Sequence, residues 1–243
     1  MNQLNRVIKF QNYDMKKSIT SFWCIILLVN ALIYAASIFF NYKIEIGPLI
    51  RNEESISIVA ANIGAIAIYF IVNWIVIYYE NFALALSFGA TRKNFYKSII
   101  INNIAVALIS SIIQGTLQVF EKNLIQYLNF NPLVDFGIFN TETDNIFFIF
   151  LALFIFFSSF ISITNLIGIL QFKFGYKFWV GFGITFIITQ IFKNSVWDRG
   201  LSILFSRSFI FLTLISILII CYIVGYLLIM KSNVKNRGRS SFP

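Results

Sequence analysis

Six long apolar runs, separated by short polar segments that hold the charges, constrain this chain more than any other feature. The runs cover residues 22–40, 56–79, 99–120, 146–170, 174–192 and 209–230. A helix needs roughly 20 apolar residues to cross the hydrocarbon core of a bilayer. Charged residues make up only 12% of the chain, too few to cover a water-exposed surface. We therefore expect an all-α integral membrane protein with a domain of six transmembrane helices over residues 22–230.

The positions of lysine and arginine predict the orientation of these helices, because basic residues are enriched in cytoplasmic loops. With the N-terminus in the cytoplasm, the segments on that side hold 13 basic and two acidic residues, and the outer segments hold six basic and eight acidic ones. We therefore expect both termini in the cytoplasm, with residues 231–243 as a basic tail. The net charge of +9 is spread between the runs and forms no single patch, so we expect no nucleic-acid partner.

Residues 1–21 predict an amphipathic helix that lies in the cytoplasmic interface of the membrane. One side of that helix is apolar and is formed by Leu4, Ile8, Met15, Ile19 and Phe22. The opposite side is basic and is formed by Arg6, Lys9, Lys16 and Lys17. Such a helix buries its apolar side among lipid headgroups, and its cations meet anionic lipid. The simpler alternative is a charged tail that only orients the first span.

The sequence lacks the residue types that several kinds of chemistry require. The apolar runs contain no Asp, Glu, Lys or Arg well inside them, and the chain has no histidine. Proton relays use ionisable residues at membrane depth, and metal sites use His or carboxylate ligands. We therefore expect no catalytic residue, metal or cofactor. The dipeptide Gly-Lys does not occur, so a Walker A motif for ATP is absent as well.

Amide side chains on the second and third runs are the candidates for lining a polar translocation path. They are Asn62, Asn73, Asn102, Asn103, Gln114 and Gln118. An amide in hydrocarbon is costly unless it finds a partner, so these side chains should face other helices or a wet cavity. Interhelical hydrogen bonds, each worth about 0.6–2 kcal/mol, are the alternative to a path. Small residues one turn apart, in Ala60–Gly64 and Ser111–Gly115, also predict close helix packing.

The segment between the second and third runs, residues 80–97, reads ENFALALSFGATRKNFYK. Gly89 is expected to end the helix that descends from the second run, and Thr91 is expected to cap a new short helix. That helix would turn its basic residues to the cytosol and offer aromatic anchors to a partner. The basic residues are Arg92, Lys93 and Lys97, and the aromatic ones are Phe95 and Tyr96. An ordinary basic loop is the simpler alternative.

This segment, with six spans and an N-terminal interfacial helix, resembles the permease subunits of bacterial ABC-2 type transporters. The resemblance implies that a turn leads into a coupling helix, which docks on an ATP-binding cassette ATPase subunit. The turn matches Gly89, Ala90, Thr91 and Arg92, and the coupling helix matches Lys93, Asn94, Phe95, Tyr96 and Lys97. Glu80 occupies the position where the family often has an acidic residue at the cytoplasmic end of the second span.

The same resemblance implies a function. It implies a permease subunit in the bacterial cytoplasmic membrane that exports a peptide, an antibiotic or a lipid-like substrate. ATP would be bound by the separate ATPase subunit, and a second permease subunit, identical or not, would complete the path. The permease itself would be no enzyme. One alternative stays open, because a membrane protein without transport activity, such as an immunity or binding protein, would have the same topology.

Overall fold

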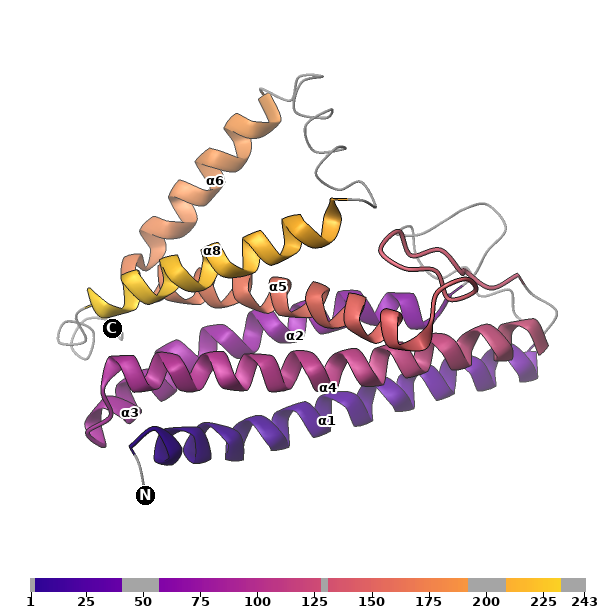
Figure 1. Ribbon diagram of the computed structural model, residues 1–243, viewed down its shortest axis with the longest axis horizontal. Coiled ribbons are helices and arrows are strands. Elements are labelled where there is room, and N and C mark those ends of the chain that lie inside the picture. The colour runs from indigo at the N-terminus through magenta and orange to yellow at the C-terminus, as the bar shows by residue number, and fades with distance from the viewer. Residues whose placement is uncertain (1–2, 41–56, 128–130, 192–208, 233–243) are drawn as a thin grey trace. The chain divides into compact units, whose positions relative to one another are not determined.

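The computed structural model describes residues 3–40, 57–127, 131–191 and 209–232. The helices within these ranges (Figure 1) are α1 (Gln3–Phe40), the 3-10 turn η1 (Val59–Ala61), α2 (Asn62–Val76), the π-helical turn η2 (Ile77–Asn81), α3 (Phe82–Ser87), α4 (Arg92–Tyr127), α5 (Ile146–Phe174), α6 (Tyr176–Ile191) and α8 (Ile210–Met230). The described residues contain no β-strand. The expected all-α fold class is therefore confirmed. The expected tail lies outside the described residues from position 233 onward.

Five stretches of the described residues are long and apolar enough to cross a membrane. They are Gln3–Ala36, Val59–Ser87, Arg92–Tyr127, Ile146–Phe174 and Ile210–Met230. Each of them overlaps one of the six apolar runs, and five runs are covered in this way. The remaining run contains α6, which has 16 residues and so spans about 24 Å at 1.5 Å per residue, less than the hydrocarbon core. Six spans and the orientation of the termini therefore stay predictions.

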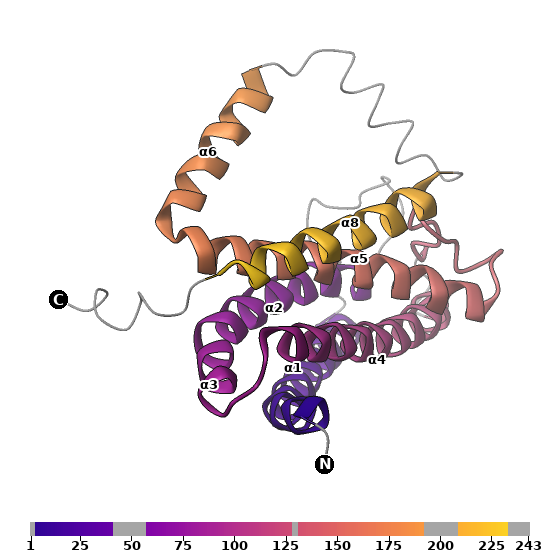
Figure 2. The ribbon, with the colours of Figure 1, turned by 60° about the vertical axis from the view of Figure 1, so that its left-hand side comes forward.

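A glycine separates α5 from α6. Gly175 lies between the two helices with a φ of +61°, in the left-handed region that glycine enters without steric cost. Its N–H donates to the carbonyl of Gln171 at 2.7 Å, which closes the last turn of α5. The two helices then diverge, as Figures 1 and 2 show. Side chains of α6 such as Val180, Phe182 and Ile187 are accordingly more than half exposed.

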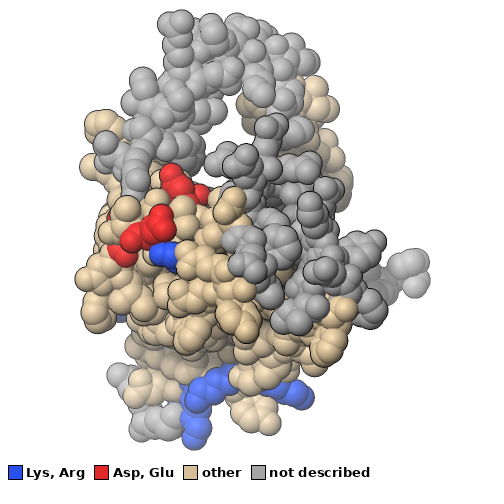
Figure 3. Space-filling view, turned by 90° about the vertical axis from the view of Figure 1, so that its right-hand side faces the viewer, with Lys and Arg blue, Asp and Glu red and all other residues tan. Residues whose placement is uncertain are grey.

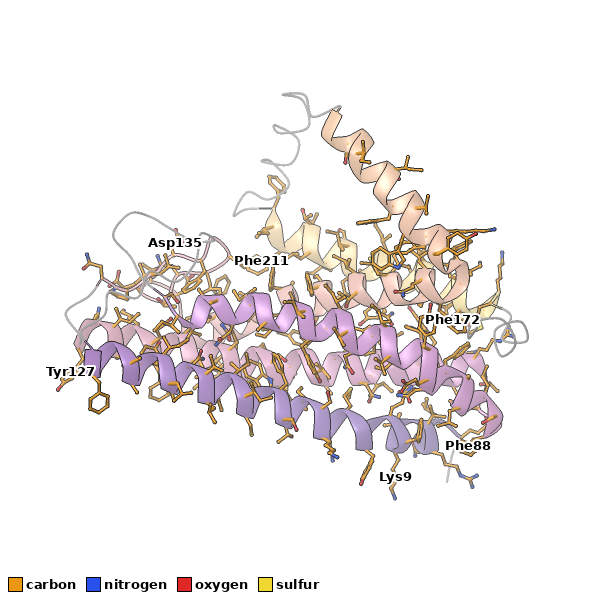
Figure 4. All side chains as sticks on the ribbon, turned by 180° about the vertical axis from the view of Figure 1, so that it is seen from behind. Lys9, Phe88, Tyr127, Asp135, Phe172 and Phe211 are labelled. Atoms are coloured by element: carbon orange, nitrogen blue, oxygen red, sulfur yellow. The ribbon has the colours of Figure 1, made fainter. Side chains whose placement is uncertain are left out.

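α1 runs through Phe22 without a break, where the sequence suggested a boundary between an interfacial helix and the first span. Its buried side chains recur every four residues, at Val7, Gln11, Met15, Ile19 and Trp23. Two of these, Met15 and Ile19, belong to the apolar side expected from the sequence. The expected basic side is exposed throughout, and Lys9 points outward from the helix in Figure 4. The structure therefore buries in the protein part of the face that we expected to lie in lipid.

The chain divides into two compact units, and the division falls inside α1, α2, α4 and α5. Unit 1 contains residues 1–11, 70–103 and 159–243, and unit 2 contains residues 12–69 and 104–158. Unit 1 has an aromatic core, in which the Phe82 ring lies 5.0 Å from that of Phe95 and 5.4 Å from that of Phe172. Between α5 and α8, Ser159 Oγ donates to the carbonyl of Leu214 at 2.9 Å.

Unit 2 contains the polar loop between α4 and α5. Its backbone is held by short side-chain bonds, in which Asp135 accepts from Gly137 N at 2.9 Å and Asp144 accepts from Asn140 N at 2.7 Å. The bond of Asp135 to the N–H two residues on is an Asx turn, which is typical of loops. Phe139 is buried beneath the loop, whereas Asp135 and Glu142 are exposed. Figure 3 shows acidic side chains gathered on this part of the surface.

Glycine packing in unit 2 supports a stability prediction. A Cβ added at Gly115 would lie 2.6 Å from Phe150 Cδ1 and 3.2 Å from Leu153 Cδ1, whereas one added at Gly64 would meet nothing within 4 Å. Of the two small-residue pairs noted in the sequence, only Ser111–Gly115 thus marks a close approach of helices. We expect Gly115→Leu to destabilise unit 2 by about 1–3 kcal/mol through overpacking. Gly64→Leu is the matched control, and thermal unfolding in detergent is the measurement. Equal melting temperatures would contradict the α4–α5 contact.

Candidate functional site

The turn between α3 and α4 begins with a Schellman motif. Gly89 N donates to the carbonyl of Leu86 at 3.0 Å, and Ala90 N donates to the carbonyl of Ala85 at 3.0 Å. These two bonds satisfy carbonyls that the helix end would otherwise leave without donors. Gly89 itself has a φ of +80°, which a residue with a Cβ adopts only at a cost. The predicted end of the helix at Gly89 is confirmed.

Thr91 then caps α4, as predicted. Its Oγ1 accepts a hydrogen bond from Asn94 N at 3.2 Å, the bond that an N-cap residue makes to the third residue of a helix. The helix that follows is not short, however. α4 continues for 36 residues from Arg92 to Tyr127, so the segment expected as a separate coupling helix is the beginning of a long helix.

This turn is hydrogen-bonded to the start of α1 and to the end of α8. Gln3 Nε2 at the start of α1 donates to the carbonyl of Gly89 at 2.9 Å, and Asn94 Nδ2 donates to Gln3 Oε1 at 3.1 Å. Arg92 Nη1 donates to the carbonyl of Met230, the last residue of α8, at 2.9 Å. A cation is favourable at the C-terminus of a helix because the helix dipole is negative there. We call residues 88–97 the braced turn. Nothing in the sequence pattern pointed to Gln3 or Met230 as its partners.

The braced turn exposes some of the expected partner-binding residues and buries others. Phe88 is 75% exposed and lies at the surface in Figure 4, and Lys93 and Lys97 are exposed as expected. Phe95 and Tyr96, by contrast, are only 0% and 1% exposed. They are core residues of unit 1 and offer no anchor on the surface of the described structure. The expectation of two exposed aromatic anchors is therefore wrong, because this turn of α4 directs both rings inward.

Glu80 lies on the π-helical turn η2, at the other end of α3, and is exposed. A π-helical turn widens the helix by one residue, and such turns occur frequently at functional sites. In η2, Tyr78 is fully buried and Glu80 is exposed. Tyr78 OH donates to Asn165 Oδ1 at 2.6 Å. This turn therefore holds a core tyrosine of unit 1 and a surface carboxylate.

α4 buries polar side chains and exposes large apolar ones, which is the reverse of the arrangement on a helix of a water-soluble protein. Its buried polar residues are Ser98, Asn102, Asn103, Ser110, Ser111, Gln114, Gln118 and Glu121. Its exposed large apolar residues include Ile101, Ile104, Leu108, Ile109, Ile112, Phe120 and Leu124. A helix that faces water has its apolar stripe inside. The reversed arrangement fits a helix whose exposed side contacts lipid. We call the buried polar residues the polar side of α4.

Within unit 1, two of the candidate path amides form hydrogen bonds between helices. Asn102 Nδ2 donates to Gln11 Oε1 on α1 at 2.9 Å, and Asn103 Nδ2 donates to the hydroxyl of Tyr222 on α8 at 2.9 Å. Hydrogen bonding between helices therefore accounts for the amide nitrogens of these two residues. The buried Oδ1 of Asn103 and the buried Nδ2 of Asn73 on α2 have no hydrogen-bond partner among the described residues.

Within unit 2, the polar side of α4 contains a buried carboxylate that sequence reasoning missed. Glu121 is 5% exposed. It accepts hydrogen bonds from Tyr34 OH at 2.7 Å, Ser57 Oγ at 2.5 Å, Ile58 N at 2.6 Å and Val59 N at 2.9 Å. The two backbone donors are at the N-terminal end of η1, where the helix dipole favours an anion. We call these five residues the Glu121 network.

The sequence placed Glu121 in an outer segment, because the third apolar run ends at Phe120. In the structure α4 continues to Tyr127 and turns Glu121 toward the interior of unit 2, while the side of the membrane on which it lies stays a prediction. A signal was available in the spacing, because Gln114, Gln118 and Glu121 recur at four and three residues and so share one side of a helix. Lys122 points elsewhere and pairs with Glu142 at 3.7 Å. Gln114 Nε2 extends the network by donating to the carbonyl of Val59 at 2.9 Å.

Comparisons with protein-family models, with curated proteins and with solved structures find no match to this chain. The resemblance to ABC-2 permeases therefore stays a proposal. The braced turn and the polar side of α4 are the two features from which a function is inferred.

Proposed function

We propose that this chain is the membrane-spanning permease subunit of an ATP-binding cassette transporter in the bacterial cytoplasmic membrane. It has six spans with both termini in the cytoplasm, and it exports a peptide, an antibiotic or a lipid-like substrate. A separate ATPase subunit binds ATP, and a second permease subunit completes the path. The observation that carries the proposal is the braced turn, which exposes Phe88, Lys93 and Lys97 while its backbone and Arg92 are bonded to α1 and α8.

The braced turn is suited to pass a movement on to the spans. α4 is one helix from Arg92 to Tyr127, so a displacement of its first turn carries the polar side of α4 with it. The bonds from Gln3 and to Met230 make the start of α1 and the end of α8 follow. In this mechanism, ATP-driven closure of the ATPase pair pushes on Lys93 and Lys97, and the path switches from inward to outward access.

One observation favours a second candidate, a membrane protein without transport activity such as an immunity or binding protein. Phe95 and Tyr96 are buried, so the surface left for an ATPase consists of the basic residues, Phe88 and Glu80. Co-purification separates the two candidates. The tagged protein is extracted from its native host in mild detergent, and the proteins that accompany it are identified by mass spectrometry. A stoichiometric Walker A protein supports the transporter. Recovery of this chain alone in several detergents overturns it.

Charge reversal tests whether the braced turn is the docking site. We expect Lys93→Glu combined with Lys97→Glu to lower ATPase co-purification at least tenfold, which corresponds to about 1.4 kcal/mol or more. Both side chains are exposed, so thermal stability should hardly change. Lys16→Glu combined with Lys17→Glu on the exposed side of α1 is the matched control. Unchanged association in the first variant, or equal loss in both, would contradict docking at this turn.

A further inference from the structure

Beside the Glu121 network, unit 2 buries polar atoms that no described protein group satisfies. Gln118 is only 2% exposed, and neither its Nε2 nor its Oε1 has a hydrogen-bond partner. The same holds for Gln114 Oε1, Asn30 Nδ2 and Asn62 Nδ2. These three side chains are also more than nine-tenths buried. Three helical segments thus contribute unpartnered donors and acceptors to the interior of one unit.

Helical register places all of these side chains close to the Glu121 network. Gln118 precedes Glu121 by three residues on α4, and Asn30 precedes Tyr34 by four residues on α1. Asn62 follows Val59 by three residues at the start of α2, and Gln114 is bonded to the Val59 carbonyl. Residues three or four apart on a helix are neighbours on its surface. Each of these amides therefore lies within one helical turn of a member of the Glu121 network or is hydrogen-bonded to one.

Rotating the amides does not remove the need for a partner. The nitrogen and oxygen of a Gln side chain can be exchanged when its orientation is assigned, but in Gln118 both atoms are unpartnered. An unsatisfied buried polar group costs about 1–3 kcal/mol. Several such groups in the interior of unit 2 would oppose the packing of α1, α2 and α4, unless a further molecule satisfies them.

The chemistry of the site defines that molecule. The free groups include both donors and acceptors, so they match a small molecule that can both donate and accept. A cation is not required, because the Glu121 carboxylate already accepts four hydrogen bonds. An internal water typically makes two to four hydrogen bonds to polar groups of this kind. We propose that α1, η1–α2 and α4 enclose a binding site for ordered water, with Gln118 at its centre. This inference does not depend on transport activity.

Hydroxyl-radical footprinting tests the site, because an X-ray pulse produces radicals from bound water that oxidise adjacent side chains. The unmodified full chain is exposed in lipid nanodiscs, and oxidation is located by mass spectrometry. Tyr34 is the reporter, because its hydroxyl contacts Glu121. Tyr13, which is 78% exposed, is the reference with the same intrinsic reactivity. We expect oxidation of Tyr34 within about tenfold of that of Tyr13. Oxidation of Tyr13 without oxidation of Tyr34 would overturn the proposal.

Variants then separate internal water from water that reaches Tyr34 from outside. Gln118→Leu removes both unpartnered atoms at similar volume, and we expect it to lower Tyr34 oxidation severalfold. Thr116→Val is the control on the same helix, because the Thr116 hydroxyl bonds to the Ile112 carbonyl within α4. Asn62→Leu provides a second test if Gln118→Leu fails to fold. Equal oxidation of Tyr34 in the wild type and in a folded Leu variant would overturn the assignment of water to this site.

Discussion

Replacing Glu121 with alanine is expected to lower the free energy of unfolding by about 3–5 kcal/mol, because buried donors lose their charged acceptor. The buried N–H groups of Ile58 and Val59 and the part-buried hydroxyls of Tyr34 and Ser57 would all lose this acceptor. The measurement is the midpoint of thermal or denaturant unfolding in detergent. We expect Glu121→Gln to have an intermediate effect, since one oxygen still accepts hydrogen bonds while the amide nitrogen faces donors.

Glu142→Ala is the matched control for this prediction. Glu142 is another acidic residue of unit 2, but its side chain is 56% exposed and pairs with Lys122 at 3.7 Å. Exposed ion pairs of this kind contribute about 0–1 kcal/mol. If Glu121→Ala and Glu142→Ala shift the midpoint equally, Glu121 is not the buried acceptor that joins α1, η1 and α4.

Replacing Phe95 with alanine is expected to cost about 3–5 kcal/mol, the range for removing a fully buried aromatic ring. Its ring lies 5.0 Å from that of Phe82 and 6.4 Å from that of Tyr78, so the deletion leaves a cavity where η2, α3 and α4 meet. Much of the cost is lost van der Waals packing, which is also what holds helices together in lipid. The measurement is the unfolding midpoint of the purified protein.

Phe88→Ala is the control, because Phe88 lies seven residues earlier and is 75% exposed. We expect it to leave the unfolding midpoint nearly unchanged. A similar midpoint for the Phe88 and Phe95 variants would contradict the inward orientation of Phe95. The pair also decides how docking experiments are interpreted. Loss of ATPase association in Phe95→Ala reports damage to unit 1, whereas loss in a folded Phe88→Ala reports the docking surface itself.

The Glu121 network and the braced turn share one structural feature. In each, the end of one helix is bonded by a side chain from a distant part of the chain. Glu121 binds the positive start of η1, and Arg92 binds the negative end of α8. Both pairings match the direction of the helix dipole. Helix ends leave backbone groups without partners, and these charged side chains satisfy some of them.

Local chemistry made part of this structure predictable. Long apolar runs require helices, because a backbone without water must satisfy its own hydrogen bonds, and five of the six runs became span-length helices. The helix end at Gly89 and the N-cap at Thr91 could be predicted, because each depends on the residue at that position and on its immediate neighbours.

For most helices, only the tertiary structure decided which side faces the protein. In a helix that is apolar all round, hydrophobicity carries no periodic signal for the buried side. On α4 the amides were expected to face inward, but Phe95 and Tyr96 were expected at the surface and are buried. The sequence also could not show that Gly115 is crowded while Gly64 is open.

The hydrogen-bond partners of Glu121 and Arg92 could not be predicted from the local sequence either. Tyr34 is 87 residues from Glu121 along the chain, and Met230 is 138 residues from Arg92. Composition and local pattern therefore determined that the chain is helical, where its helices turn and how apolar they are. The tertiary fold decided which polar groups meet, because a hydrogen bond between distant helices depends on how those helices pack.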